Sequence, residues 1–162
     1  MCHMATEAAA SGDEQVQADI CRLMKTSFTS TYNAVTATSL ANTLLHTTYM
    51  GTKNSSQATE QRAVRLATQI GSYHLTLNID GMVEAVLNTF SNLFGKRPQF
   101  VLHGGTPTED VALQNLQARL RMVTAYMLAS LLPWTRGHSG FLLVLGSANV
   151  DEGKSLSFLF VS

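Results

Sequence analysis

Residues 43–79, TLLHTTYMGTKNSSQATEQRAVRLATQIGSYHLTLNI, predict a strand, a helix and a second strand in direct succession. The first strand covers 43–50, and Gly51 ends it. The helix covers 56–70: Ser55 or Ser56 can cap its start, and Gly71 follows its last turn. Residues 73–79 alternate between apolar and polar side chains, as a half-buried strand does. Such a unit implies a right-handed crossover between parallel strands, so we expect an open α/β sheet with flanking helices.

Two further helices are predicted after this unit. Asp80 can cap the first, which ends at Gly95. Thr106-Pro107-Thr108-Glu109 has the pattern of a capping box with proline at the first helical position, and it opens a helix that Pro133 stops after Leu132. An apolar stripe is expected to run along that helix through Leu113, Leu116, Leu120, Val123, Met127 and Leu131.

Residues 141–146, FLLVLG, predict the third strand. They are wholly apolar, which favours a strand buried on both faces, as in a parallel sheet. Upstream, residues 13–24 predict a short amphipathic helix, and the Ser/Thr-rich segment 26–39 predicts a loop, either wholly irregular or with one helical turn. His46, inside the first strand, is interpreted as a hydrogen-bonded core residue.

The composition of the chain argues against several classes of function. The 162 residues suit one domain, 45% of them are hydrophobic, and the formal net charge is zero. A neutral balance favours neither nucleic-acid binding nor a basic membrane patch, and no apolar run is long enough to span a bilayer. Cys2 and Cys21 do not make a disulfide framework, and the start lacks the pattern of a signal peptide. We therefore expect a cytoplasmic protein without nucleic-acid or membrane partners.

The segment GSANVDE, 146–152, follows the third predicted strand. In open parallel sheets ligands bind beyond the carboxyl ends of the strands. Ser147 offers a hydroxyl there, and the following carboxylates suit Mg²⁺ together with phosphate oxygens. Alternatively, Asp151 caps a helix and Glu152 is solvated.

Asn115 and Arg119 form a second candidate site. They are spaced i, i+4 on one helix face, and a guanidinium beside an amide suits a carboxylate or phosphate ligand. The alternative is a solvated helix face, or a pair that holds a neighbouring loop. The histidines lack metal-ligand spacing, and the sequence contains no GxSxG, Walker A or GxGxxG motif.

Three long blocks carry a family resemblance: LHTTYMGTKNSSQATEQRA, VALQNLQARLRM and LLVLGSANVDE. Over roughly residues 14–153 the chain resembles the synthetase domain of eukaryotic glutamine-dependent NAD⁺ synthetases. The resemblance implies a Rossmann-like fold of the adenine nucleotide alpha-hydrolase type, with a five-stranded parallel sheet. It also implies adenylation of deamido-NAD⁺ by ATP and Mg²⁺, followed by displacement of AMP by ammonia derived from glutamine, with no permanently bound cofactor.

The resemblance also implies site residues, while leaving the catalytic residues unassigned. Asn115 and Arg119 match positions that contact deamido-NAD⁺. ATP is expected at Ser147 and, for its adenine, at the segment containing Tyr49 and Met50. Glu152 matches a carboxylate that binds Mg²⁺ or lies against the substrate.

The chain departs from the family pattern in two places. The phosphate loop, SGGxDS, is absent from the 162 residues, and KSLSFLFVS, 154–162, resembles nothing in the family. We therefore expect residues 1–153 to be a partial synthetase domain, inactive alone, and 154–162 to be an unrelated tail. The alternative is a non-catalytic fragment that pairs with full-length subunits or with itself.

Only three strands are counted, at 43–50, 73–79 and 141–146, where the family has five. An apolar strand without a neighbour presents free backbone groups, so we expect the chain not to be a stable monomer. Alternatively, KSLSFLFVS folds back as a substitute strand and shields that edge.

Overall fold

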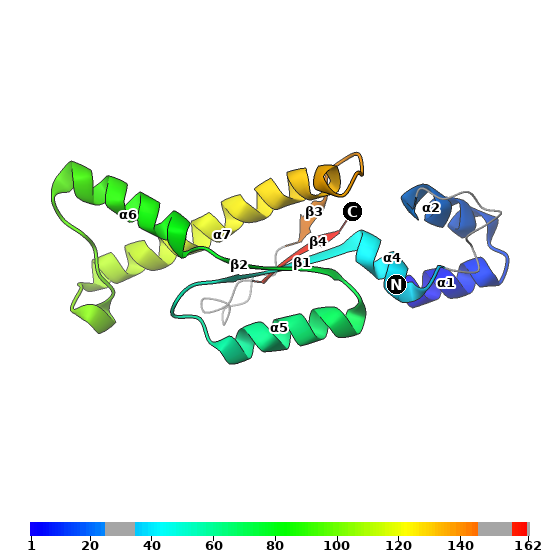
Figure 1. Cartoon of the computed structure of the whole chain (residues 1–162), viewed down its shortest axis with the longest axis horizontal. Coiled ribbons are helices and arrows are strands. Elements are labelled where there is room, and N and C mark those ends of the chain that lie inside the picture. Colours follow the sequence, from blue (N-terminus) through cyan, green and yellow to red (C-terminus); the bar gives the residue numbers. More distant parts are fainter. Residues whose placement is uncertain (25–34, 146–156, 162) are drawn as a thin grey trace.

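The structure is a computed structural model that describes residues 1–24, 35–145 and, by their backbone, 157–161. A sheet runs through the middle, with α6 and α7 on one side, α5 on the other, and α1 and α2 grouped beyond α4 (Figure 1). The helices are α1 Cys2–Ala10, α2 Glu14–Met24, α4 Ala37–Leu44, α5 Gln57–Ile70, α6 Asp80–Phe94, the 3-10 turn η2 Val101–His103 and α7 Pro107–Thr135. The strands are β1 Leu45–Gly51, β2 Tyr73–Asn78, β3 Leu143–Leu145 and β4 Ser157–Val161.

The described sheet has the strand order β2-β1-β4-β3. β1 and β2 pair in parallel, from His46 opposite Tyr73 to Gly51 opposite Asn78. β4 pairs antiparallel with both β1 and β3. The predicted α/β class is thus confirmed, but the prediction of a parallel sheet holds only for β1 and β2. The fold-back expected of the KSLSFLFVS segment is observed for its residues 157–161, because β4 lies between β1 and β3.

The β1–α5–β2 unit forms as predicted, but the predicted capping hydrogen bond to a serine side chain is not made. Ser56 is the N-cap residue of α5, although its side chain makes no capping hydrogen bond. Gly71 ends α5 in the left-handed conformation, with φ of 74°. A Cβ at this position would collide with the methyl group of Thr38 in α4, so glycine is required for both conformation and space.

The capping box that opens α7 is confirmed. The Thr106 side chain accepts from the Glu109 backbone, and the Glu109 carboxylate accepts from the Thr106 backbone at 2.7 Å. The predicted stop at Pro133 is wrong, because α7 continues to Thr135. Proline has no N–H to donate to the Ala129 carbonyl. The backbone of Leu142 donates to that carbonyl instead, at 2.9 Å, which ties the approach to β3 against α7.

The main core lies between the sheet and the helices α6 and α7. Its buried members are Met50, Ile79, Val83, Ala125, Ala129, Leu132 and Leu142, against which Tyr73, Leu75 and Leu77 of β2 pack. The predicted alternation of the 73–79 strand is therefore confirmed.

The prediction that FLLVLG is buried on both faces is wrong. Leu143 is 62% exposed and Phe141 is 80% exposed. β3 is the outer strand of the described sheet and pairs only with β4 among the described strands. Leu142, just before β3, is buried against α7, whereas no described helix covers the opposite face of this strand.

A smaller core joins α1, α2 and α4 around Ala9, Ile20 and Leu40. α2 was predicted, whereas α1 was not. The predicted loop 26–39 is wrong at its end, since α4 begins at Ala37 through a reciprocal capping box of Thr36 and Ser39. α4 also takes the first two residues of the strand predicted at 43–50. Residues 25–34 lie outside the described part. Across that part, no helix combines the length and apolarity needed to cross a membrane.

Candidate functional site

The carboxyl ends of β1 and β2 are tied together by their backbones. The N–H of Ile79 donates to the carbonyl of Gly51 at 2.9 Å. The Asp80 carboxylate accepts from the backbone N–H of Lys53 at 2.7 Å, and the Asn78 side chain accepts from the Asp80 N–H at 2.6 Å. The prediction that Asp80 caps α6 is wrong, because its side chain instead holds the loop that leaves β1. Two strand ends and two connecting loops thus form one hydrogen-bonded rim.

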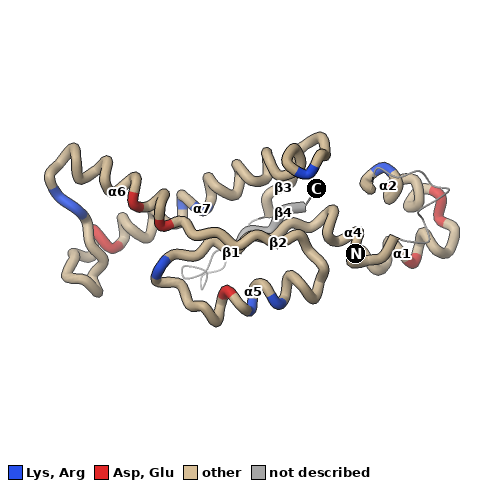
Figure 2. The backbone as a smooth tube through the Cα atoms, in the orientation of Figure 1, with Lys and Arg blue, Asp and Glu red and all other residues tan. Residues whose placement is uncertain are grey.

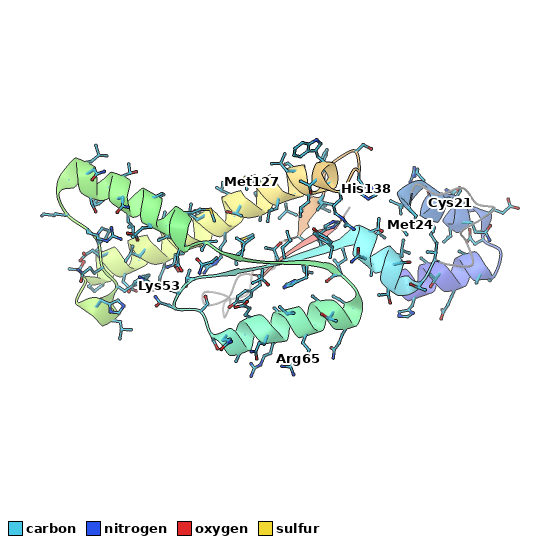
Figure 3. All side chains as sticks on the ribbon, in the orientation of Figure 1. Cys21, Met24, Lys53, Arg65, Met127 and His138 are labelled. Carbon is cyan, nitrogen blue, oxygen red and sulfur yellow. The ribbon has the colours of Figure 1, made fainter. Side chains whose placement is uncertain are left out.

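A cavity of about 320 Å³ opens beside this rim, between the loops and the helices α6 and α7. Lys53, at the turn between β1 and α5, marks this end of the sheet in Figure 3. The polar residues that line the cavity include Lys53, Asn54, Asp80, Gln99, His103 and Gln117. Polar and charged side chains predominate in this lining, beside apolar ones such as Val83, Leu87 and Leu113, and this position is where ligands of open α/β sheets bind.

Arg97 fixes one wall of the cavity. Its guanidinium donates to both carboxylate oxygens of Glu84, at 2.6 and 2.7 Å, and to the side-chain oxygen of Asn88 at 2.9 Å. This two-point contact holds the segment after α6 against that helix. The positive charge of Arg97 is therefore matched within the wall.

Tyr49 and Met50, predicted for adenine, lie at this end of β1. Their side chains are buried, with 6% and 3% exposed. Met50 belongs to the main core, and its carbonyl accepts a hydrogen bond from Nε of Arg121 at 3.1 Å. Because both side chains are buried, a ligand at this end of β1 would meet the rim and the cavity instead.

The structure places Asn115 and Arg119 on the exposed face of α7. Neither side chain makes a hydrogen bond or ion pair with another described residue. The side chains that α7 directs toward the strand ends are Gln117, which lines the cavity, and Arg121, which is half-buried. Burial lowers the pKa of Arg121, and nearby Tyr49 acts in the opposite direction.

Gln117 and Arg121, which α7 directs toward the sheet, were not predicted from the sequence. Gln117 and Arg121 are also spaced i, i+4, so the pattern that singled out Asn115 and Arg119 occurs twice in the same helix. The apolar stripe could have distinguished the two pairs, because Leu113, Leu116 and Leu120 lie on the inward side.

The candidate residues Ser147 and Glu152 lie outside the described residues. Within residues 1–24 and 35–145, no group of three or more His, Cys, Asp or Glu side chains is placed to hold a metal ion. The Mg²⁺ site at Glu152 stays a prediction.

Comparison with known proteins identifies the family. A family model described as NAD synthase matches residues 26–152. The glutamine-dependent NAD(+) synthetases of Rattus norvegicus and Homo sapiens are 52% and 51% identical over 152 residues, which is 94% of this chain and 21% of each relative. The enzyme of that name from Oryza sativa subsp. indica is 49% identical over 153 residues, 94% of this chain and 20% of the relative. The chain thus spans about a fifth of the length of these curated relatives. By the match to its family model, which covers most of the sequence, the chain belongs to the NAD synthase family.

Proposed function

We propose that this chain is part of the synthetase domain of an enzyme of NAD⁺ biosynthesis, which amidates deamido-NAD⁺ with ATP and glutamine-derived ammonia in the cytoplasm. The observation that carries the proposal is the family match over residues 26–152, which includes both loops and the helix around the cavity. The proposed fold is of the adenine nucleotide alpha-hydrolase type. Its parallel β1–α5–β2 unit supports that assignment, because the cavity lies beyond the carboxyl ends of these strands.

The described residues position the substrates and do not themselves form or break covalent bonds. Arg121 holds α7 against the end of β1, so a ligand on the rim is aligned with groups on α7. Lys53 and Gln117 line the cavity and offer donors to phosphate or ribose oxygens. Asn115 and Arg119 present an amide and a guanidinium on the outer face of α7, where the family resemblance assigns them to deamido-NAD⁺.

ATP and Mg²⁺ enter as substrate and ion. Bound Mg²⁺ neutralises charge on transferring phosphates, and a carboxylate such as that of Glu152 is the type of ligand it takes. Ser147 and Glu152 belong to the matched family segment, and their roles toward ATP and Mg²⁺ are part of this proposal.

The 162-residue chain alone is expected to make no NAD⁺. The test incubates purified chain with deamido-NAD⁺, ATP, Mg²⁺ and ammonia, with the full-length Homo sapiens relative as positive control. Binding of ATP or deamido-NAD⁺ is followed in parallel by calorimetry. Binding without turnover is the expected outcome. NAD⁺ formation within about a thousandfold of ordinary enzyme turnover would show that the chain is a complete catalyst.

A second candidate function is non-catalytic pairing with full-length subunits or with another copy of the chain. The observation that favours it is the apolar outer face of α7, where Val123, Tyr126, Met127 and Trp134 are each more than half exposed. Met127 points away from the sheet in Figure 3. Co-elution of the tagged chain with the full-length relative, lost in Met127→Glu, supports pairing. Separate elution of wild-type chain and relative rejects it.

A further inference from the structure

A second cavity, of about 260 Å³, lies at the opposite end of the sheet. His46 near the start of β1, Arg136 just past α7 and Leu142 just before β3 all line it. Figure 3 shows His138 at this end, beyond α7 and facing the α2 group, with Lys53 at the other end. β1 has seven residues, so its length separates the two cavities by roughly 20 Å.

The lining of this cavity is basic. Arg22 of α2, Arg136, His46 and His138 contribute cationic or protonatable groups, and Ser139 adds a hydroxyl. No aspartate or glutamate is among the described residues that line it. Figure 2 shows basic positions both on α2 and at the end of α7. Asp19 forms an ion pair with Arg22 at 3.1 Å, but this pair is on the solvent-exposed surface of α2.

Arg136 is held in place without a negative partner among the described residues. One terminal nitrogen donates to the carbonyl of Asn42 at 2.9 Å and to Nε2 of His46 at 2.7 Å, and the other donates to the Asn42 side chain at 3.0 Å. The guanidinium lies over the Tyr73 ring, 4.2 Å from its centroid. These neutral partners take three of its five N–H groups, so an immobilised cation retains donors for an anion.

His46 adds a second, independent observation. Its side chain is 3% exposed, and its Nδ1 atom lies near the Leu44 backbone but makes no hydrogen bond of good geometry with a described residue. A buried polar atom without a partner is uncommon and calls for an explanation such as a bound group. Phe141, Leu142 and Pro133 supply apolar walls, which strengthen electrostatic attraction inside the cavity.

We propose that this cavity binds a small phosphate anion, either inorganic phosphate or the terminal phosphate of a small molecule, between Arg136, Arg22, His138 and Ser139. The fixed guanidinium of Arg136, with further cationic and imidazole donors around it and no carboxylate in the cavity lining, is the chemistry that selects a tetrahedral oxyanion. The site is distinct from the proposed nucleotide cavity, because it lies at the amino end of β1. It does not depend on NAD⁺ synthesis by this chain.

The test is an NMR titration of the full 162-residue chain, following the imidazole signals of His138. Inorganic phosphate is added at constant ionic strength, with sodium chloride as the reference titration. Pyrophosphate and a phosphomonoester in separate titrations distinguish a free phosphate site from one for a larger molecule. Saturable shifts with phosphate and none with chloride are expected.

Matched variants locate the site. Arg22→Gln should weaken phosphate binding about tenfold, since one charge-assisted contact is lost. Ser139→Ala should weaken it less. Arg65→Gln, which removes an exposed arginine of α5 from the far side of the sheet, should leave the affinity within about twofold (Figure 3).

Two results would overturn the proposal. One is a His138 signal that moves equally with phosphate and chloride. The other is an equal loss of affinity in Arg22→Gln and Arg65→Gln, which would reveal nonspecific attraction to basic surface. Both variants alter exposed side chains, so folding is checked by the unchanged pattern of the remaining backbone signals.

Discussion

The guanidinium of Arg136 donates a hydrogen bond to Nε2 of His46, with 2.7 Å between the nitrogen atoms. An arginine has only donors, so Nε2 must accept, and the neutral ring carries its proton on Nδ1. Burial lowers the pKa of His46 to about 4, and the nearby charge of Arg136 acts in the same direction; a hydrogen bond with the Leu44 backbone opposes them, and His138 adds the smallest contribution, which also lowers the pKa. His46 is therefore a neutral histidine that links β1 to the end of α7.

The free energy of unfolding should fall as the pH is lowered below 6.5, the ordinary pKa of a histidine. In the unfolded chain His46 binds a proton near pH 6.5, whereas the folded chain resists protonation down to about 4. Between these values the unfolded state holds more protons, so the free energy of unfolding decreases with falling pH. The decrease should reach at most roughly 3 kcal/mol, and this histidine should contribute little slope above about pH 7.5. Urea unfolding across this pH range measures it.

The matched variant for this pH dependence is His46→Gln, which removes the titrating ring and should flatten most of the slope. His74 adds in the same direction, since burial also lowers its pKa. His74→Gln should therefore remove a smaller part. An unfolding free energy of wild type that is equal at about pH 5 and about pH 7 contradicts the prediction.

The two arginines of the QARLR segment should behave differently. Arg121→Ala should lower the free energy of unfolding by about 1.5–3 kcal/mol, because the contact between α7 and the Met50 carbonyl is lost. Arg119→Ala alters an exposed side chain and should stay within about 0.5 kcal/mol of wild type. In a full-length relative, the Arg119 change should instead weaken deamido-NAD⁺ more than ATP. Equal destabilisation by both changes would show that Arg119 is structural.

Sequence patterns confined to a few neighbouring residues predicted several helices and strands correctly. The strand and glycine pattern of β1–α5–β2 and the Thr106–Glu109 capping box are examples, and both are observed. α4 was missed because its segment, rich in serine and threonine, has the composition of a loop; its capping pair, Thr36 and Ser39, lacks the usual glutamate. The position of β4 could not be derived from local pattern, since it depends on pairing with strands far away in the sequence.

The sequence indicates less clearly which face of α7 packs against the sheet. In its second half apolar residues occur all around the helix: Val123, Met127 and Leu131 are exposed, whereas Ala125 and Ala129 are buried. The predicted stripe is therefore correct through Leu120 and wrong beyond it. The same ambiguity affects the site, because choosing between the outer and inner i, i+4 pairs requires knowing which face meets the sheet.

Two glycines should respond in opposite ways to alanine. Gly71→Ala places a methyl group against Thr38 at a left-handed φ of 74°, so it should destabilise the chain by about 1–2 kcal/mol. Gly81→Ala lies in the first turn of α6 with open space around its Cβ and should stabilise the chain by up to about 1 kcal/mol. Thermal unfolding compares them. Destabilisation by Gly81→Ala as large as that by Gly71→Ala would contradict the assigned contact with α4.

β4 pairs with a strand on each side, and the substitution Leu159→Pro tests whether this pairing holds the sheet together. In the register, Leu159 stands opposite Thr47 of β1 and Leu145 of β3. A proline inside a strand paired on both sides removes a hydrogen bond of the ladder, so β4 should leave the sheet and expose the edges of β1 and β3. Exposed edges pair with other chains, so the variant should form oligomers or aggregates, while the wild type with β4 in place should elute as a monomer. Leu159→Val is the control, since it keeps an apolar, strand-favouring residue. Size-exclusion chromatography with light scattering measures the mass of each. A proline variant that stays monomeric and unfolds as cooperatively as the valine variant would show that β4 does not hold the sheet together.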